Sequence, residues 1–412
     1  MLGEEARRAA ERVARESYGR LVAFLAARTR DVAGAEDALA EAFASALASW
    51  PRDGVPDNPD AWLLTVARRR QTDALRRRQT QQAGEEHLQL MADELDAAAA
   101  DPAHIPDRRL ALMFACAHPA IEAGMRAPLI LQTVLGLPAH DIAAALLIPP
   151  ATMGQRLVRA KTRIRHAGIP FVVPEGEQLP ERLDTVLEAI YAAYAKGWAE
   201  FGEGGVSPLA EEAIWLGQLV AALLPDAPEA RGMLALMLFT EARRPARRDA
   251  AGAFVPLEEQ DTTLWDDSLI DLAEAQLHAA NAGGPGGRYQ LEAAIQSAHT
   301  ARRLYGTDSW PAIVALYGHL LAITGSPVVA LNRAAALAEI EGPAAALTAI
   351  EELAADRRMV AYQPYWATRG HLCARAGRRA EAHEALTVAL GLSADPALRN
   401  YLRQQLAALR ID

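Results

Sequence analysis

Apolar residues recur at helical spacing along nearly the whole chain, and this regularity constrains the fold more than any other feature. In the segment 35–50, for example, Leu39, Phe43 and Leu47 follow one another four positions apart, so we expect one helix face to bury all three. Alternation of apolar and polar residues, the pattern of a half-buried strand, is almost absent. The sequence therefore predicts an all-α protein.

The length of 412 residues is too great for a single core, so we expect two or three domains. A first helix is expected at about 4–30, burying Val13, Leu21, Phe24 and Leu25. The stretch 79–106 is polar, acidic and weakly periodic, as in a linker. A proline-rich junction follows Gly168. These breaks predict helical domains at 1–78, 107–168 and 180–412.

The C-terminal part looks repetitive. Gly342 precedes Gly377 by 35 residues, close to the period of about 34 residues of a tetratricopeptide (TPR) repeat. The last unit has small and aromatic residues near the TPR spacing: Trp366, Gly370, Ala382, Leu386, Ala389 and Pro396. We therefore predict TPR-like helix pairs, whose concave surface would suit a protein or peptide partner.

Charge is unevenly distributed along the chain. The formal net charge is −10, but residues 1–170 carry +1 and the remainder −11. Within the first part, basic residues gather in 68–78 and 156–165. Two basic stripes in an otherwise acidic protein allow local binding of nucleic acid while the protein stays soluble.

The first basic stripe lies in the segment NPDAWLLTVARRRQTDALRRR, residues 58–78. Asn58 fits a helix N-cap and is followed by proline at the first helical position. Six arginines follow, and an Asp73–Arg77 pair would contribute only a few tenths of a kcal/mol. The remaining cations require water or a polyanion. The alternative is a solvated charge run with Trp62 in the core, which is also where we expect Trp62.

The second stripe lies in LPAHDIAAALLIPPATMGQRLVRAKTRIRHAG, a short helix, a tight turn and a longer helix starting at 151 or 152. One face of the longer helix is apolar and carries Met153, Leu157, Ala160 and Ile164. Another face carries Gln155, Arg156, Arg159 and Arg163. This is a helix-turn-helix pattern, in which the second helix enters the major groove. The alternative is an amphipathic surface helix with solvated arginines.

Taken together, AEDALAEAFASALASW, the 58–78 stripe, a linker and ATMGQRLVRAKTRIR resemble regions 2 and 4 of bacterial extracytoplasmic-function (ECF) sigma factors. The continuation FVVPEGEQLPERLDTVLEAIYAAYAKGW is similar to the junction of an ECF group with a C-terminal TPR-like helical extension. The resemblance implies that region 2 (1–78) binds core RNA polymerase and the minus-ten element. Region 4 (107–168) would read the minus-thirty-five element as a duplex, and the acidic linker 79–106 would run toward the active-site channel.

The resemblance also assigns residues. Asp37 and Glu41 would dock on the clamp helices of the polymerase largest subunit, and region 4 on the flap. The expected DNA contacts are Arg68, Arg69, Arg76, Arg77, Thr152, Gln155, Arg156, Arg159, Lys161 and Arg163. Many ECF factors carry Asn where this chain has Arg70, so no base-specific role is transferred to that position.

No enzyme motif or cofactor site is recognisable, and neither enzymatic activity nor a cofactor is expected. Cys116 and His118 are expected in a core, and Glu381, His383 and Glu384 on a solvated face. The glycine-rich GGPGGRYQ follows no strand and predicts a flexible turn. No apolar run of about 18 residues or signal peptide is present, so we expect a cytoplasmic protein without membrane contact.

Three function classes fit these patterns. A sigma factor would bind core polymerase and direct promoter-specific initiation. A stand-alone helix-turn-helix regulator with a TPR-like interaction domain would usually need a dimer, and no heptad segment suited to that is apparent. A scaffold acting through its TPR-like surface would make the basic helices incidental.

Overall fold

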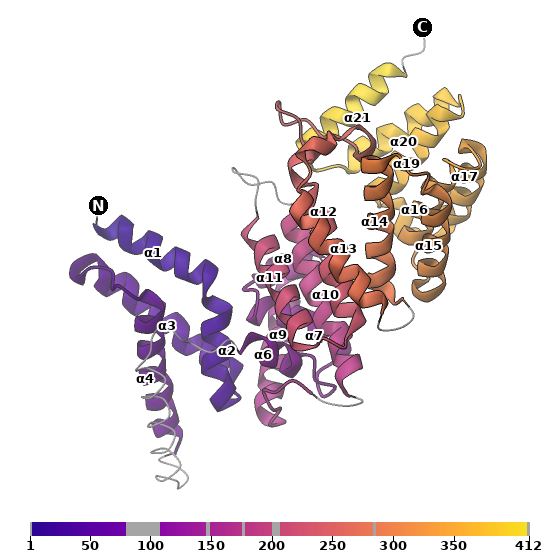
Figure 1. Cartoon of the computed structure of the whole chain (residues 1–412). Helices are drawn as coiled ribbons and strands as arrows, with labels where there is room; N and C mark the ends of the chain where they lie inside the picture. The colour runs from indigo at the N-terminus through magenta and orange to yellow at the C-terminus, as the bar shows by residue number, and fades with distance from the viewer. Residues whose placement is uncertain are drawn as a thin grey trace. The chain divides into compact units, whose positions relative to one another are not determined.

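The computed structural model describes residues 2–79, 108–145, 149–174, 178–199, 207–282 and 286–409. Helices form the architecture throughout these ranges (Figure 1), and the described residues contain no strand. The only β-type pairing among them is an isolated bridge between Arg248 and Phe254. The all-α prediction is confirmed.

The chain divides into two compact units. The first comprises residues 1–197 with 208–213, and the second comprises 198–207 with 214–412. Both predicted sigma regions lie in the first unit. Helix α10 (Gln178–Ala199) belongs to that unit up to Gly197, although the sequence suggested a C-terminal domain from 180 onward. The predicted linker 79–106, apart from Gln79 at the end of α4, lies outside the described residues.

Four helices build the region-2 part of the first unit: α1 (Leu2–Glu16), α2 (Tyr18–Thr29), α3 (Val32–Asp53) and α4 (Pro59–Gln79). The single helix expected at about 4–30 is interrupted at Ser17. Val13, Leu21 and Leu25 are buried as predicted, whereas Phe24 is half-buried.

The expectation that Leu47 is buried is wrong. Its exposed fraction is 50%, because the core face of α3 consists of Ala35, Leu39, Ala42, Ala46 and Trp50. Leu47 lies about 100° around the helix from Ala46. Small residues on the core face let neighbouring helices approach, and Trp50 fills the remaining space.

The start of α4 follows the sequence signals. The Oδ1 atom of Asn58 accepts a hydrogen bond from the backbone N–H of Ala61 at 3.1 Å, which makes Asn58 the N-cap. The ring of Trp62 meets Trp50 edge to face, with centroids 5.4 Å apart. Trp62 therefore packs against the core of the region-2 bundle, as expected.

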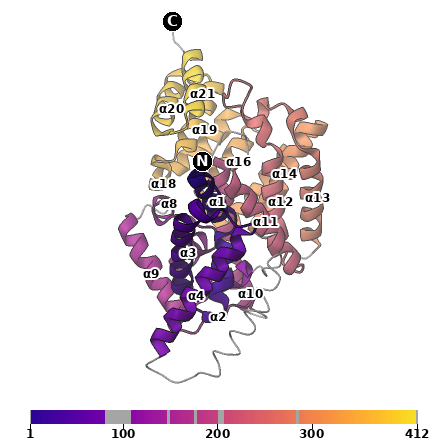
Figure 2. The ribbon, with the colours of Figure 1, turned by 90° about the vertical axis from the view of Figure 1, so that its left-hand side faces the viewer.

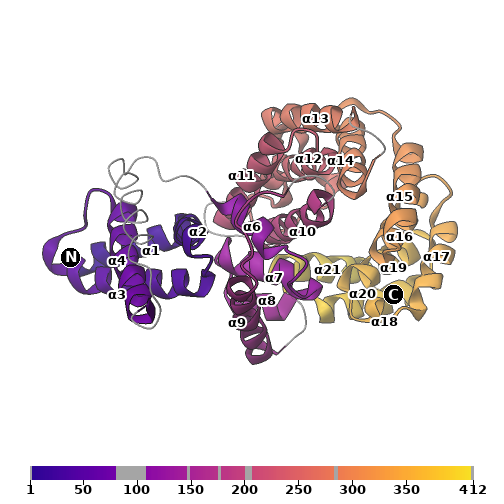
Figure 3. The same cartoon turned by 90° about the horizontal axis from the view of Figure 1, so that it is seen from below.

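The rest of the first unit contains α6 (Arg109–Cys116), α7 (Ala123–Thr133), α8 (Ala139–Ala145), α9 (Pro150–His166) and α10. Ion pairs fasten α10 to this group, from Arg126 to Glu181 at 3.1 Å and from Lys196 to Asp141 at 3.5 Å. Arg109, at the start of α6, pairs with Glu212 near the start of α11 (Pro208–Leu223). Seen from below, α6 to α10 are grouped together (Figure 3).

The second unit is a succession of helices that pack on their neighbours in sequence. They are the rest of α11, then α12 (Pro228–Ala242), α13 (Asp267–Asn281), α14 (Arg288–Tyr305), α15 (Trp310–Thr324), α16 (Pro327–Leu337), α17 (Pro343–Glu351), α18 (Arg357–Val360), α19 (Gln363–Arg375), α20 (Arg379–Leu392) and α21 (Pro396–Ala408). Short 3₁₀ turns lie at Arg244–Arg247, Leu257–Glu259, Thr262–Leu264 and Glu352–Ala355.

Small residues at the predicted repeat positions allow close helix pairing. A Cβ atom added at Gly370 would lie 2.6 Å from Cγ of Leu386, so only glycine permits this approach of α19 to α20. Gly342 and Gly377 have φ values of +85° and +76°, a conformation that favours glycine. A glycine with positive φ thus precedes both α17 and α20.

Candidate nucleic-acid interface

Helix α9 presents its basic side chains on a face held away from the core. Met153, Leu157, Ala160 and Ile164 are buried, as the sequence predicted, and they fix the rotation of the helix. Gln155, Arg159 and Arg163 are consequently exposed, and Thr152 and Arg156 are half-buried. Helix α8 packs against α9, as the first helix of a helix-turn-helix does. The turn residues 146–148 lie outside the described residues.

The arginines on this face have no acidic partner. Across the described parts of the chain, Arg156, Arg159 and Arg163 form no ion pair. Arg159 Nε donates a long hydrogen bond, 3.4 Å, to the backbone oxygen of Gln155. Three guanidinium groups on one exposed face are therefore positioned to bind an external anion, and Arg also matches base edges in the major groove.

Val158, which sequence reasoning missed, is exposed on α9 beside this face. Its exposed fraction is 63%, the highest of any large aliphatic side chain among the described residues. It stands three positions after Gln155 and is therefore its neighbour on the helix surface. Its position one residue after the buried Leu157 could have indicated that Val158 is exposed. An exposed apolar group here can contact the methyl group of thymine.

Lys161 does not face the solvent with these residues. Its side chain is 9% exposed, and its Nζ donates to Oε2 of Glu36 on α3. Arg165 Nη1 binds Oδ2 of Asp31 at 3.2 Å, beside the first pair. Burial raises the pKa of Glu36 more than the Lys161 ammonium lowers it. These pairs join α9 to α3, which lie side by side (Figure 2), so Lys161 could reach a phosphate only if the contact opened.

The arginines of α4 have more varied surroundings than those of α9. The guanidinium of Arg68 lies over the Phe24 ring at 5.2 Å and is half-buried. Arg69 is exposed, and Arg70 Nε is 3.3 Å from Oε2 of Glu41. Arg76 and Arg77 belong to the last turns of α4, but their side chains lie outside the described residues.

One face of α3 is exposed and combines acidic with apolar groups. Asp37 and Glu41 lie one turn apart and are both exposed, as is Ala44 one turn further. Leu47 extends the same stripe. This stripe, Asp37, Glu41, Ala44 and Leu47, is called the α3 face below. The α3 face thus presents two carboxylates and one exposed leucine to the solvent.

The other candidate sites have structural explanations. Cys116 is fully buried against the Thr133 hydroxyl, Sγ to Oγ1 3.6 Å, and burial raises its pKa to about 12. Helix α14 begins within the glycine-rich GGPGGRYQ, at Arg288, and its first amides are bound by a carboxylate. Glu229 accepts from the N–H groups of Tyr289 and Gln290, at 2.9 and 3.1 Å. That helix terminus is therefore not open to a phosphate.

Clusters of three or more His, Cys, Asp or Glu side chains arranged for a metal ion do not occur among the described residues. His383 and Glu384 are exposed, and Glu381 pairs with Arg378 at 2.6 Å. Within the same part of the chain, every helix is too short or too polar to cross a lipid bilayer.

Comparisons with known proteins match two parts of the chain to families and most of its length to one relative. Residues 13–81 match the family described as Sigma-70 region 2, and residues 182–281 match a family of unknown function, DUF6596. The uncharacterized protein R00370 of Rhizobium meliloti (strain 1021) is 40% identical over 379 residues, covering 90% of this chain and 89% of that protein. No solved structure matches.

Proposed function

We propose, on the premise that this chain belongs to the ECF-like sigma factors with a helical C-terminal extension, that it binds core RNA polymerase and directs promoter-specific initiation. Its role in transcription initiation follows from the Sigma-70 region 2. The proposal also includes a region-4 helix-turn-helix formed by α8 and α9, and a regulatory TPR-like domain.

The observation that carries this proposal is the α9 face. Gln155, Arg156 and Arg159 lie toward its N-terminal half, where a recognition helix contacts base edges. Arg163 lies one turn further on, where it would meet phosphate. Lys161 joins the phosphate contacts only once its pair with Glu36 has opened.

Helix α4 would act on the minus-ten element. Arg69 is exposed near the middle of the helix, and Arg76 and Arg77 follow in sequence toward its end, so the helix can line its cations along one strand. Unstacking bases costs a few kcal/mol per step. Contacts between the α3 face and the clamp helices of the polymerase share this cost, and the isolated protein therefore binds promoter duplex weakly.

The first unit has to open before both elements can be bound. Their names place them about 25 base pairs apart, roughly 85 Å along B-form DNA. Helices α3 and α9 touch each other, and neither α4 nor α9 is longer than about 35 Å. The contact made by Glu36 with Lys161 and Asp31 with Arg165 thus belongs to the free protein, and binding of core polymerase separates the two regions.

Reconstituted transcription tests the proposal. Purified full-length protein is added to bacterial core polymerase with genomic fragments as templates, beside an Arg156→Ala, Arg159→Ala variant. The matched control is Arg358→Ala, Arg378→Ala, because it also removes two exposed arginines, which are paired with Asp356 and Glu381. We expect specific initiation with the wild type and the control only. Equal initiation by both double variants would refute the assignment of α9.

The same assay separates the two other function classes. A stand-alone regulator would bind its DNA site equally well with and without core polymerase. A scaffold would show no loss in the Arg156→Ala, Arg159→Ala variant.

The C-terminal domain would regulate the sigma regions or dock on polymerase. Support comes from its size and from α10, which the Arg126 and Lys196 ion pairs fasten to the region-4 helices. A truncation should therefore follow Leu223, so that α10 and α11 are kept. If this shorter chain initiated at the target promoter with unchanged rate and regulation, the regulatory role would be abandoned.

A further inference from the structure

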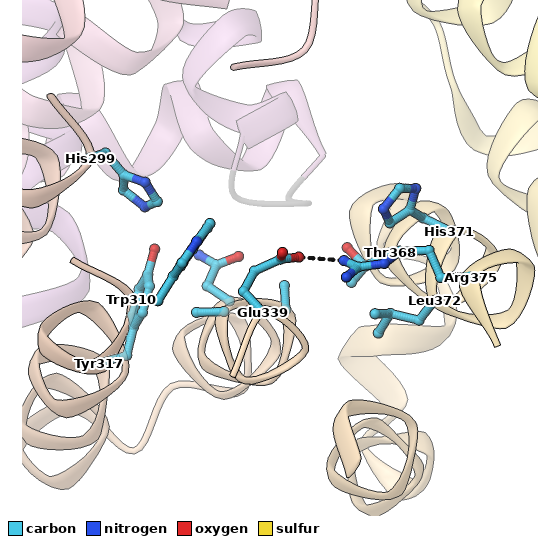
Figure 4. A pocket seen from close by; sticks show the side chains of 11 residues that line it. His299, Trp310, Tyr317, Glu339, Thr368, His371, Leu372 and Arg375 are labelled. Carbon is cyan, nitrogen blue, oxygen red and sulfur yellow. Dashed lines mark hydrogen bonds and ion pairs between the residues drawn. The ribbon is translucent and has the colours of Figure 1, made fainter. Parts of the chain in front are cut away.

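A pocket in the second unit has a composition that the sequence did not reveal. It encloses about 300 Å³ and is lined by side chains of α14, α15, α16 and α19 (Figure 4). This volume is at the lower end of ligand pockets. His299, Trp310 and Tyr317 form one end, and His371 and Arg375 form the opposite wall. Asn332 of α16 also lines the pocket.

The pocket carries no net charge at neutral pH. Burial, together with Arg243 and Arg302, lowers the pKa of His299 to about 4. Burial and Arg375 also lower the pKa of His371. The charged side chains in the lining are Glu339 and Arg375, and they pair with each other. A charged ligand would lose hydration here and would find the charges of the lining already paired with each other, so the lining favours an uncharged ligand.

The end formed by α14 and α15 is aromatic. The rings of His299 and Trp310 meet edge to face at 5.6 Å and 86°, and Tyr317 lies beside them (Figure 4). Burial raises the pKa of Tyr317 to about 12, so its hydroxyl remains a neutral donor. Nδ1 of His299 is buried and has no hydrogen-bond partner among the described residues. Such an end suits an aromatic ring with a hydrogen-bonding substituent.

Helices α16 and α19 supply uncharged polar groups to the pocket. Asn332 is exposed on α16 and offers a carboxamide, which both donates and accepts hydrogen bonds. Thr368 on α19 offers a hydroxyl that does the same. A ligand amide can pair with such groups in both directions, whereas a carboxylate cannot donate.

We propose that this pocket binds an uncharged aromatic group joined to amides, as an aromatic residue within a peptide segment of a protein partner supplies. The inference deepens the interaction role proposed for the C-terminal domain and rests on it. Binding is measured on the full-length protein without polymerase or DNA. Failure of the sigma assignment and failure of this inference are therefore distinguishable.

The probe is N-acetyl-L-tyrosinamide, titrated into the full-length protein with ligand-observed NMR or calorimetry as readout. A fragment of this size should bind with a Kd on the order of 1 mM. The blocking variant is Ala335→Phe, which fills the pocket from α16. Its matched control is Ala344→Phe, the same change at an exposed position of α17. We expect about tenfold weaker binding by the first variant and unchanged binding by the second.

Two further probes test the chemistry. N-acetyl-L-tyrosine carries a negative charge, and p-cresol lacks both amides. Each should bind about tenfold more weakly than N-acetyl-L-tyrosinamide. Asn332→Ala, at an exposed site, should weaken the binding of N-acetyl-L-tyrosinamide severalfold. It also provides a second variant if Ala335→Phe fails to fold. The inference is overturned if the amide does not bind at about 10 mM, if either probe binds as tightly, or if the pocket variants bind it normally.

Discussion

Arginine is used in opposite ways in two regions of this protein, around Arg244 and on the exposed face of α9. In the second unit, Arg244 is 5% exposed, binds Glu241 at 2.5 and 3.0 Å, and lies over the Trp198 ring at 4.7 Å. On α9 in the first unit, Arg159 and Arg163 are exposed and have no acidic partner among the described residues. A paired arginine is part of the fold, whereas a stripe of unpaired arginines marks a surface for an external anion. Four predictions test this contrast.

The largest effect is expected inside the second unit. Arg244→Ala removes one partner of a buried ion pair and leaves the Glu241 carboxylate, 14% exposed, without its guanidinium. We expect the free energy of unfolding to fall by about 3 kcal/mol in urea titrations. Promoter binding by the folded protein should not change. A loss below about 0.5 kcal/mol would show that Arg244 does not stabilise the fold, despite its pair with Glu241.

The next effect is on the pH dependence of stability. Burial, together with Arg243 and Arg302, lowers the pKa of His299 to about 4, below its unfolded value near 6.5. The folded state then binds fewer protons than the unfolded state. The stability linked to neutral His299 is therefore present above pH 6.5 and is lost as the pH falls toward 4.

Between pH 7 and pH 5 the loss attributable to His299 should be about 1 to 2 kcal/mol. His299→Gln should remove that part of the pH dependence in urea titrations at the two pH values. If the free energy of unfolding changed equally between the two pH values in wild type and variant, the assignment to His299 would be contradicted.

On α9 the apolar contact should contribute less than the arginines. Val158→Ala should weaken promoter binding of the polymerase complex by about 1 kcal/mol, or roughly fivefold, because a thymine methyl loses its partner. Replacing thymines of the minus-thirty-five element one at a time by uracil should show one position where wild type loses affinity and Val158→Ala does not. Equal losses in both proteins at every thymine would exclude this contact.

The smallest change concerns the salt dependence. Arg163→Ala should weaken binding similarly on all promoters and reduce the slope of log K against log salt by about 1, since one phosphate contact is lost. The control is Arg378→Ala in the second unit, whose guanidinium is already paired with Glu381 at 2.6 Å. If both variants changed the slope equally, pairing with an acid would not distinguish the two kinds of arginine.

Features that depend on neighbouring residues could be predicted from the amino-acid order alone. Helical periodicity gave the all-α class, Asn58 marked the start of α4, and the spacing of Met153, Leu157, Ala160 and Ile164 set the rotation of α9. Each of these is decided within a few turns of helix, where residues three and four apart share a face.

The roles of the basic and apolar side chains depend on contacts between distant segments. Lys161 lies in a basic stripe of the sequence, but Glu36, 125 residues away, binds it. Leu47 fits the apolar period of α3, yet Ala46 and Trp50 take the core positions and leave it half exposed. Helix α10 joins the first unit through ion pairs with α7 and α8. These outcomes depend on packing between segments distant in sequence, and local periodicity carries no information about such partners.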